Sequence, residues 1–256
     1  MKKPNRLYLG TNTKMYKTIA ETNSFLTQLR QLTEDLADSP LTLFVIPSFT
    51  SLESANRITS GSHIRLGAQN MCWEDQGQFT GEISPVMLKE VGVSVVEIGH
   101  SERRHVFREN DFDQEKKTAK AAQSGFTPLL CIGETLTQRE YGLSGETLST
   151  QLKVGLHSVT AEQAEHLWIA YEPVWAIGTG QTASDEDIRM VHTLVRELLS
   201  SLLGSNGIGI QILYGGSVKP DNAKAILSLD NVDGLLVGGA SLQAQSFADI
   251  VRADLA

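Results

Sequence analysis

The chain has 256 residues, 41% of them hydrophobic and 20% charged, which is typical of a globular protein and fits the size of one α/β barrel. Its formal net charge of −8 disfavours nucleic acid or an anionic membrane as a partner, so an anionic substrate would need a local positive site. The two cysteines, Cys72 and Cys131, have no disulfide or metal-site spacing. Because no signal-peptide core and no membrane-length apolar run is present, we expect a cytoplasmic protein.

Short apolar segments alternate with amphipathic segments along the chain. The apolar segments are almost continuously hydrophobic, as strands covered on both faces are. They lie at 6–12, 41–47, 64–69, 93–100, 127–134, 167–173, 208–216 and 232–239. The amphipathic segments predict helices. In one of them, Ser184 and Asp187 have the spacing of a capping box and Gly204 stands where the helix should stop.

Eight strand–helix repeats without a linker predict a single closed parallel (β/α)8 barrel domain over residues 1–256. A doubly wound open sheet is the alternative. It often carries a glycine-rich turn after its first strand, but the segment here is GTNTKMYKT, which contains no GxGxxG.

Polar residues follow several predicted strands, and barrels of this kind carry their chemistry at the carboxyl ends of the strands. Asn12 and Lys14 follow the first strand, His100 the fourth and Glu172 the sixth, while the last two end in YGGS and VGGAS. A Glu base, a His proton donor, a Lys charge and glycine N–H groups predict proton abstraction beside the carbonyl of a small phosphorylated sugar. No HExxH or CxxC spacing indicates a metal, and this chemistry needs no cofactor.

The motifs GHSERR, AYEPVWAIGTG, YGGSV and DGLLVGGASL, in this order, are similar to those of the triosephosphate isomerase family. GAQN and GQFTGEIS match as well, so the resemblance covers essentially the whole chain. It implies a homodimeric isomerase of glycolysis and gluconeogenesis that interconverts dihydroxyacetone phosphate and D-glyceraldehyde 3-phosphate through an enediolate.

The resemblance also implies a role for each polar residue at the rim. Glu172 is the base that moves a proton between C1 and C2, and His100, as a neutral imidazole, donates to the enediolate oxygens; this Glu and His scheme is the known one for the family. Lys14 offsets the negative charge of substrate and intermediate. Asn12 contributes to the same oxyanion pocket, and Glu102 supports the reaction near Lys14.

The sequence HSERR bears on two of these roles. A helical turn that begins beside His100 would lower the pKa of the ring and keep it neutral at pH 7. For Glu102 the alternative to a catalytic role is an ion pair with Arg103 or Arg104.

The remaining motif residues are implied to bind the phosphate and to close over it. Backbone N–H groups of Gly178, Ser217, Gly238 and Gly239 would hold the phosphate. The lid comprises Pro173, Val174, Trp175, Ala176, Ile177, Gly178, Thr179 and Gly180, with a second hinge at 181–183. Tyr214 and Ser217 would latch the closed lid, which excludes water from the site.

A long segment, NMCWEDQGQFTGE (70–82), follows the third predicted strand. Its apolar residues Met71, Cys72, Trp73 and Phe79, exposed on a projecting loop, would indicate an interface. The resemblance implies that this loop crosses a homodimer and brings Thr80 close to Asn12 and Lys14 of the partner subunit.

Three positions depart from the family pattern: Thr13 replaces a usual Trp, Tyr16 a small polar residue, and Glu97 an aliphatic residue in the fourth strand. Strand alternation predicts that Glu97 points to the helix layer and shares no face with His100. Two motifs, WEDQGQFTGEISPVML and VVEIGHSERR, also resemble isomerases that interconvert L-erythrulose 1-phosphate and D-erythrulose 4-phosphate, which is the alternative activity. A barrel that binds a phosphorylated metabolite without turnover is the other alternative.

Overall fold

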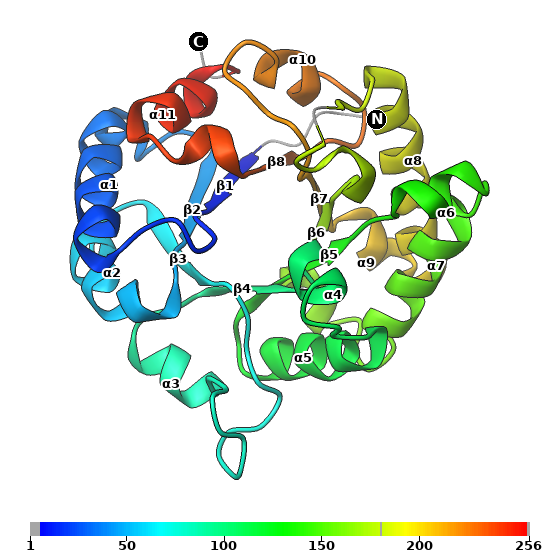
Figure 1. Ribbon diagram of the computed structural model, residues 1–256, viewed down its shortest axis with the longest axis horizontal. Helices are drawn as coiled ribbons and strands as arrows, with labels where there is room; N and C mark the ends of the chain where they lie inside the picture. The colour runs from blue at the N-terminus through cyan, green and yellow to red at the C-terminus, as the bar shows by residue number, and fades with distance from the viewer. Residues whose placement is uncertain (1–5, 180, 255–256) are drawn as a thin grey trace.

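Eight parallel strands form a closed barrel in chain order in the computed structural model of the protein, which describes residues 6–179 and 181–254 (Figure 1). The strands are β1 (Leu7–Asn12), β2 (Leu41–Ile46), β3 (Ile64–Ala68), β4 (Val95–Ile98), β5 (Thr127–Ile132), β6 (Trp168–Tyr171), β7 (Gln211–Tyr214) and β8 (Gly234–Val237). The barrel closes where β1 pairs with β8, with Tyr8 opposite Gly234. The predicted (β/α)8 barrel is confirmed, and the open sheet is excluded because neither β1 nor β8 is an edge.

Helices surround the barrel and connect its strands (Figure 1). The α-helices are α1 (Ile19–Leu32), α2 (Leu52–Thr59), α3 (Pro85–Glu90), α4 (Ser101–His105), α5 (Asp111–Gln123), α6 (Leu136–Glu140), α7 (Ser144–Gly155), α8 (Asp185–Leu203), α9 (Ser205–Ile208), α10 (Ala223–Leu227) and α11 (Ala244–Arg252). Short 3-10 turns are η1 (Glu34–Leu36), η2 (Phe49–Ser51), η3 (Gln163–His166), η4 (Val174–Ala176) and η5 (Gly239–Ser241). Within the described ranges, no helix combines the length and the apolar character needed to cross a membrane.

The helix α8 begins and ends where the sequence predicts. Ser184 caps it by accepting a hydrogen bond from the backbone N–H of Asp187, whose side chain accepts from Ser184 in return. Gly204, with φ of +60°, terminates it. This capping matters for the site because α8 begins directly after the lid.

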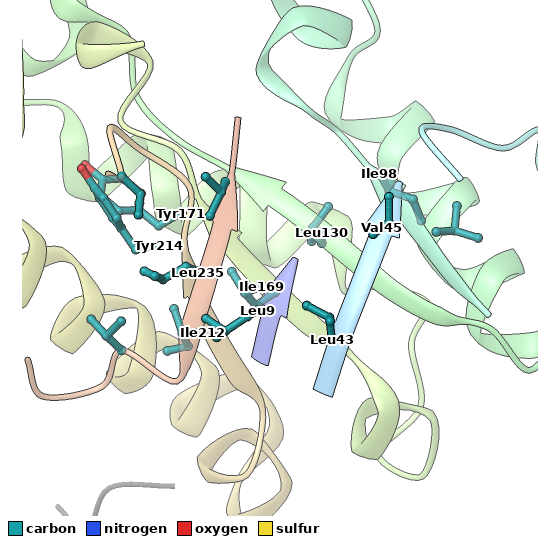
Figure 2. Packing of buried hydrophobic residues seen from close by; sticks show 14 of the residues in the cluster. Leu9, Leu43, Val45, Ile98, Leu130, Ile169, Tyr171, Ile212, Tyr214 and Leu235 are labelled. Atoms are coloured by element: carbon teal, nitrogen blue, oxygen red, sulfur yellow. The ribbon is translucent and has the colours of Figure 1, made fainter. Parts of the chain in front are cut away.

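Alternation along the strands divides the apolar residues into two clusters. The larger cluster joins one face of the strands to the helices; Figure 2 shows Leu9, Ile169 and Leu235 among its strand residues. The smaller cluster lies on the other strand face and fills the barrel interior, with Phe44, Val95, Leu129, Cys131, Trp168 and Leu213 among its members. The barrel interior is therefore filled with side chains, and the place for a reaction site is the rim of the barrel.

The segment between β3 and α3 projects from the barrel (Figure 1). Residues 74–80 are exposed, including Thr80 and Phe79, and the Phe79 ring packs against Trp73 at 6.3 Å between centroids. Met71 and Cys72, however, are 1% and 3% exposed. The expectation that they are exposed is wrong, because the backbone N–H of Cys72 bonds to the carbonyl of Ile83 and ties the base of the loop to the body.

Candidate active site

A cavity of about 630 Å³ opens at the carboxyl ends of the strands. Its lining includes Asn12, Lys14, His100 and Glu172, which the sequence places after three different strands. The lid and glycine positions that line it are Ala176, Ile177, Gly178, Ser217, Gly238 and Gly239. Residues separated by more than 200 positions thus meet in one hollow.

Glu172 follows β6 directly and is 3% exposed. Its backbone N–H donates to the carbonyl of Ile132 at 2.8 Å, which fixes the position of its Cα beside β5. Both carboxylate oxygens accept from Ser101, Oε2 from the backbone N–H at 2.9 Å and Oε1 from the hydroxyl at 3.3 Å. Oε1 also lies 3.2 Å from Nε2 of His100. The carboxylate is therefore buried, hydrogen-bonded and in contact with the imidazole.

His100 stands at the start of α4, as the sequence predicts. Its Nδ1 accepts a hydrogen bond from the backbone N–H of Glu102 at 3.2 Å. An accepting Nδ1 has no proton, so the single ring proton belongs on Nε2, from where it can be donated to Glu172. This arrangement favours a neutral imidazole with its N–H toward the cavity.

The charges around His100 differ from the sequence-based expectation. Burial lowers the pKa of His100, but the carboxylates of Glu172 and Glu97 outweigh burial and raise it above its ordinary value. The expected lowering is wrong, because it considered only the helix terminus and not the carboxylates that the fold brings to the ring. Neutrality depends instead on the Glu102 N–H, which can donate to Nδ1 only when that nitrogen has no proton.

Asn12 and Lys14 form a tight turn at the end of β1. Lys14 has φ of +48°, an unusual conformation for a residue with a side chain. The backbone N–H of Lys14 donates to Oδ1 of Asn12 at 2.7 Å, and Gln69 bridges Oδ1 of Asn12 and the carbonyl of Lys14 at 3.1 and 2.8 Å. These contacts stabilise a turn that presents both side chains to the cavity.

Lys14 and Glu102 form an ion pair with 2.7 Å between Nζ and Oε1. The alternative partners of Glu102 are engaged elsewhere: Arg103 bonds Glu109 at 2.8 Å, and Arg104 bonds a carboxylate of α5. Glu102 therefore lies next to Lys14, as the resemblance implies. It is not among the residues that line the cavity.

The glycine positions leave room for an anion. Gly178 has φ of +71°, and a Cβ added at Gly178, Gly238 or Gly239 would meet no atom within 4 Å. Ser217 lines the same cavity between strands β7 and β8. Backbone N–H groups at such positions can approach a phosphate closely.

The predicted lid includes the turn η4, and Trp175 anchors this segment. Its indole Nε1 donates to Oε1 of Glu134 at 2.9 Å, and the guanidinium of Arg139 lies 4.1 Å from its ring centroid. Thr179 donates back to the carbonyl of Trp175 at 3.0 Å. Pro173, Val174, Ala176 and Ile177 complete the described lid, and Gly180 lies outside the described residues.

Tyr214 ends β7 beneath the lid, and its ring is fully buried against Tyr171 (Figure 2). Burial raises the pKa of Tyr214 to about 12, with the backbone of Ser217 acting in the opposite direction, so the hydroxyl keeps its proton. This hydroxyl makes no hydrogen bond of ordinary geometry to any described residue. The latch of the lid by Tyr214 and Ser217 stays a prediction.

The profile of the triosephosphate isomerase family matches residues 7–254, which is nearly the whole barrel. The chain belongs to the triosephosphate isomerase family. Its relatives include the triosephosphate isomerase of Carboxydothermus hydrogenoformans, 46% identical over 100% of both chains. Those of Trichlorobacter lovleyi and Dictyoglomus turgidum are each 45% identical, over 95% and 96% of this chain and 97% and 99% of their own. Their names favour the triose over the tetrulose alternative.

In this member of the family Glu97 points into the barrel, and the expectation that it faces the helix layer is wrong. It shares a face of β4 with Val95, an interior residue, and its Oε2 accepts from Nδ2 of Asn12 at 2.6 Å. Strict alternation would put Glu97 and His100 on opposite faces, but Gly99, with φ of +73°, interrupts it. Glu97 therefore lies below the rim, on the side of the predicted catalytic residues.

Sequence reasoning missed three residues that position this family's site. Ser101 holds the base, Gln69 braces the β1 turn, and Glu134 accepts from both Tyr171 and Trp175. Burial raises the pKa of Glu134. A signal existed for Glu134, because it ends the apolar segment TPLLCIGE as Glu172 ends its own strand.

The two other departures from the family pattern differ in their relation to the cavity. Tyr16 lines it and is 68% exposed. Thr13 is 1% exposed and is not among the lining residues; its backbone N–H bonds the carbonyl of Ile46. Substitution of Trp by Thr at this position therefore does not widen the cavity directly.

Proposed function

We propose that this chain interconverts dihydroxyacetone phosphate and D-glyceraldehyde 3-phosphate in the rim cavity, with Glu172 as the base. The observation that supports this most is the contact at 3.2 Å between the buried Glu172 carboxylate and Nε2 of His100 inside one cavity, with Nδ1 of the same ring accepting from a backbone N–H. Glu172 removes a proton from the carbon next to the carbonyl and returns it to the neighbouring carbon. Each step is a proton transfer that these side chains can perform.

His100 and Glu172 divide the acid and base work. The Nε2–H of His100 donates to the oxygens of the enediolate as charge develops on them. Its Nδ1 is held by the Glu102 N–H, so the ring is oriented before the substrate arrives. Glu172 must give up part of its contact with Ser101 to reach the substrate carbon, which links its position to movement of the adjoining lid.

Lys14 and Asn12 supply the electrostatic stabilisation. The Lys14 ammonium lines the cavity with its charge fixed by Glu102, and it offsets the charge of phosphate and enediolate. The side-chain amide of Asn12 supplies a further N–H donor beside Lys14 in the cavity lining. In a chain of net charge −8, such a local positive group is what an anionic substrate requires.

The phosphate binds to backbone N–H groups of Gly178, Ser217, Gly238 and Gly239. All four positions line the cavity; Gly178 follows β6, Ser217 follows β7, and Gly238 and Gly239 follow β8, the strand that pairs with β1. The lid segment that the structure describes, 173–179, closes over this anion and excludes water, which strengthens every charge interaction at the reacting carbons.

The functional protein is a homodimer in which the 70–82 loop reaches the partner subunit. Phe79 is 40% exposed at the tip of this loop, and Met15 and Tyr16, beside the cavity, are 95% and 68% exposed. Apolar side chains of this size gain free energy when a second subunit covers them. Phe79→Asp should yield monomers by size-exclusion chromatography with light scattering; a parent chain that is monomeric at micromolar concentration contradicts the proposal.

The location proposed for this enzyme is the cytoplasm. Cys72 and Cys131 are both free and buried, which a reducing compartment preserves.

The substrate assignment is tested by comparing kcat/KM for D-glyceraldehyde 3-phosphate with that for D-erythrulose 4-phosphate, using the same purified protein. The triose should be preferred. Turnover of the four-carbon ketose alone would reassign the substrate, and binding of both without turnover would indicate a non-catalytic barrel.

A further inference from the structure

Glu97 is a buried carboxylate that the proposed reaction does not use. It is 1% exposed, and the residue opposite it in β5, Leu129, is apolar. Val95, on the same face of β4, belongs to the packed interior. A carboxylate in such surroundings is costly unless it makes a specific contact. Its hydrogen bond with Asn12, at 2.6 Å, is that contact.

The Asn12 amide is held by three partners. Its Oδ1 accepts from the backbone N–H of Lys14 at 2.7 Å and from Nε2 of Gln69 at 3.1 Å, while Nδ2 donates one proton to Glu97 at 2.6 Å. The opposite orientation would turn the amide NH2 toward two donors and its oxygen toward the carboxylate. The second N–H of Nδ2 is left for the cavity that Asn12 lines.

We infer that Glu97 is a positioning residue for Asn12: its carboxylate fixes the amide so that a free N–H, and not the carbonyl, is presented to the substrate oxygen. Preorganised donors aimed at developing negative charge lower the barrier because they need no reorientation during the reaction. The inference rests on the proposed function, in which Asn12 contributes to the oxyanion pocket.

The hydrogen bond does not require a charged Glu97. Burial raises the pKa of Glu97 to about 7; His100 and Lys14 act to lower it, whereas Glu172 and Glu102 act to raise it further. Oε1 has no hydrogen-bond partner among the described residues, so a proton can reside there while Oε2 continues to accept from Asn12. A glutamine, whose amide oxygen can occupy the place of Oε2, should therefore perform the same function.

Three variants separate positioning from a general structural role. In Glu97→Leu, which removes the acceptor, we expect kcat to fall by roughly 10- to 100-fold with KM changed less than about threefold, because the phosphate contacts remain. In Glu97→Gln we expect kcat within about threefold of the parent, since the acceptor is kept. Val95→Ala, the control, removes interior volume on the same strand face; it should lower the unfolding midpoint and leave kcat within about threefold.

A double-mutant cycle shows whether Glu97 acts through Asn12. With Asn12→Ala as background, Glu97→Leu should cost less than about threefold further in kcat, because the amide that it positions is absent. Full additivity of the two losses would overturn the inference. So would a Glu97→Leu enzyme as fast as the parent, or a Glu97→Gln enzyme as slow as Glu97→Leu.

A readout independent of turnover keeps this test separate from the proposed function. If the parent has no isomerase activity, the proposed function fails, but the Asn12 side-chain amide can still be followed by NMR in the intact protein. Its protons should exchange slowly in the parent and in Glu97→Gln and at least about tenfold faster in Glu97→Leu. Equal exchange in all three would overturn the positioning role.

Discussion

The two sides of the rim are built from different chemical groups. On the side of β1 and β4, side chains hold one another: Asn12 with Glu97, Lys14 with Glu102, and His100 with a backbone N–H of α4. On the side of β7 and β8, the cavity lining includes Gly215, Gly216, Gly238 and Gly239, and the buried hydroxyl of Tyr214 makes no hydrogen bond of ordinary geometry to a described residue.

This difference reflects two physical tasks. Stabilising charge on a small intermediate needs dipoles that are already oriented, and interlocked side chains supply them. Binding and releasing a phosphate requires that backbone N–H groups come close to it and that a neighbouring segment can move. Small residues allow both. Glu172, between the two sides on β6, contacts His100 on one and adjoins the lid on the other.

The largest effect should come from Glu172→Gln, which removes the base that connects both sides. We expect kcat to fall by about 10³-fold or more, since general base catalysis is lost, while inhibition by inorganic phosphate changes little. Steady-state kinetics in both directions measure this. A variant within tenfold of the parent would show that Glu172 is not the base.

A smaller loss is expected from the fixed side of the rim. Asn12→Ala removes one donor and should lower kcat by about 10²-fold, on the order of 3 kcal/mol in barrier. It should also destabilise the fold by about 1–3 kcal/mol, because Glu97 loses its buried partner. Asn206→Ala, which removes an exposed amide outside the cavity, is the control for both measurements.

On the side of the predicted lid, Trp175→Phe should alter substrate binding more than chemistry. It deletes the hydrogen bond to Glu134 that anchors the lid, leaving Tyr171 as the donor to that carboxylate. We expect KM to rise about threefold with kcat almost unchanged, and stability to fall by about 1 kcal/mol. Trp73→Phe provides the matched control. A drop in kcat with constant KM would mean that Trp175 belongs with the fixed side.

The last effect concerns pH and is measured in stability, not in turnover. The pKa of Glu97 is about 7 in the fold and about 4.3 when unfolded, so the folded protein binds this proton more tightly. Its contribution to stability is therefore fully present below about pH 4.3 and is lost as the pH rises through about 7. Glu97→Gln should lack this loss, so its stability relative to the parent should increase between pH 5 and 8 in urea unfolding. A pH-independent difference would refute the raised pKa.

The barrel could be predicted because patterns only a few residues long mark its strands and the ends of its helices. Each strand is a short apolar segment with glycine or polar residues after it, and Ser184 and Gly204 mark the ends of α8 without reference to the rest of the chain. The rim residues could be assigned for the same reason: Asn12, His100 and Glu172 each follow a strand, and parallel strands of a barrel place such residues on one rim.

The errors arose where the outcome depends on neighbours distant in sequence. The pKa of His100 differs from the expectation because Glu172 reaches the ring from β6, and because Glu97, close in sequence, faces the site and not the helix layer. Met71 and Cys72 were placed on the surface because the contact with Ile83 that buries this end of the loop is not a local signal.

The sequence by itself thus determined the number of strands, the order of the layers and the identity of the groups at the rim, because hydrophobic periodicity and capping act over a few residues. The tertiary structure alone decided which carboxylate meets which donor. Glu97 shows the reason: one glycine with positive φ, Gly99, ends the alternation of β4, and the closed barrel then brings that carboxylate to an amide 85 residues away. Electrostatics at the site depends on such distances, which no local pattern contains.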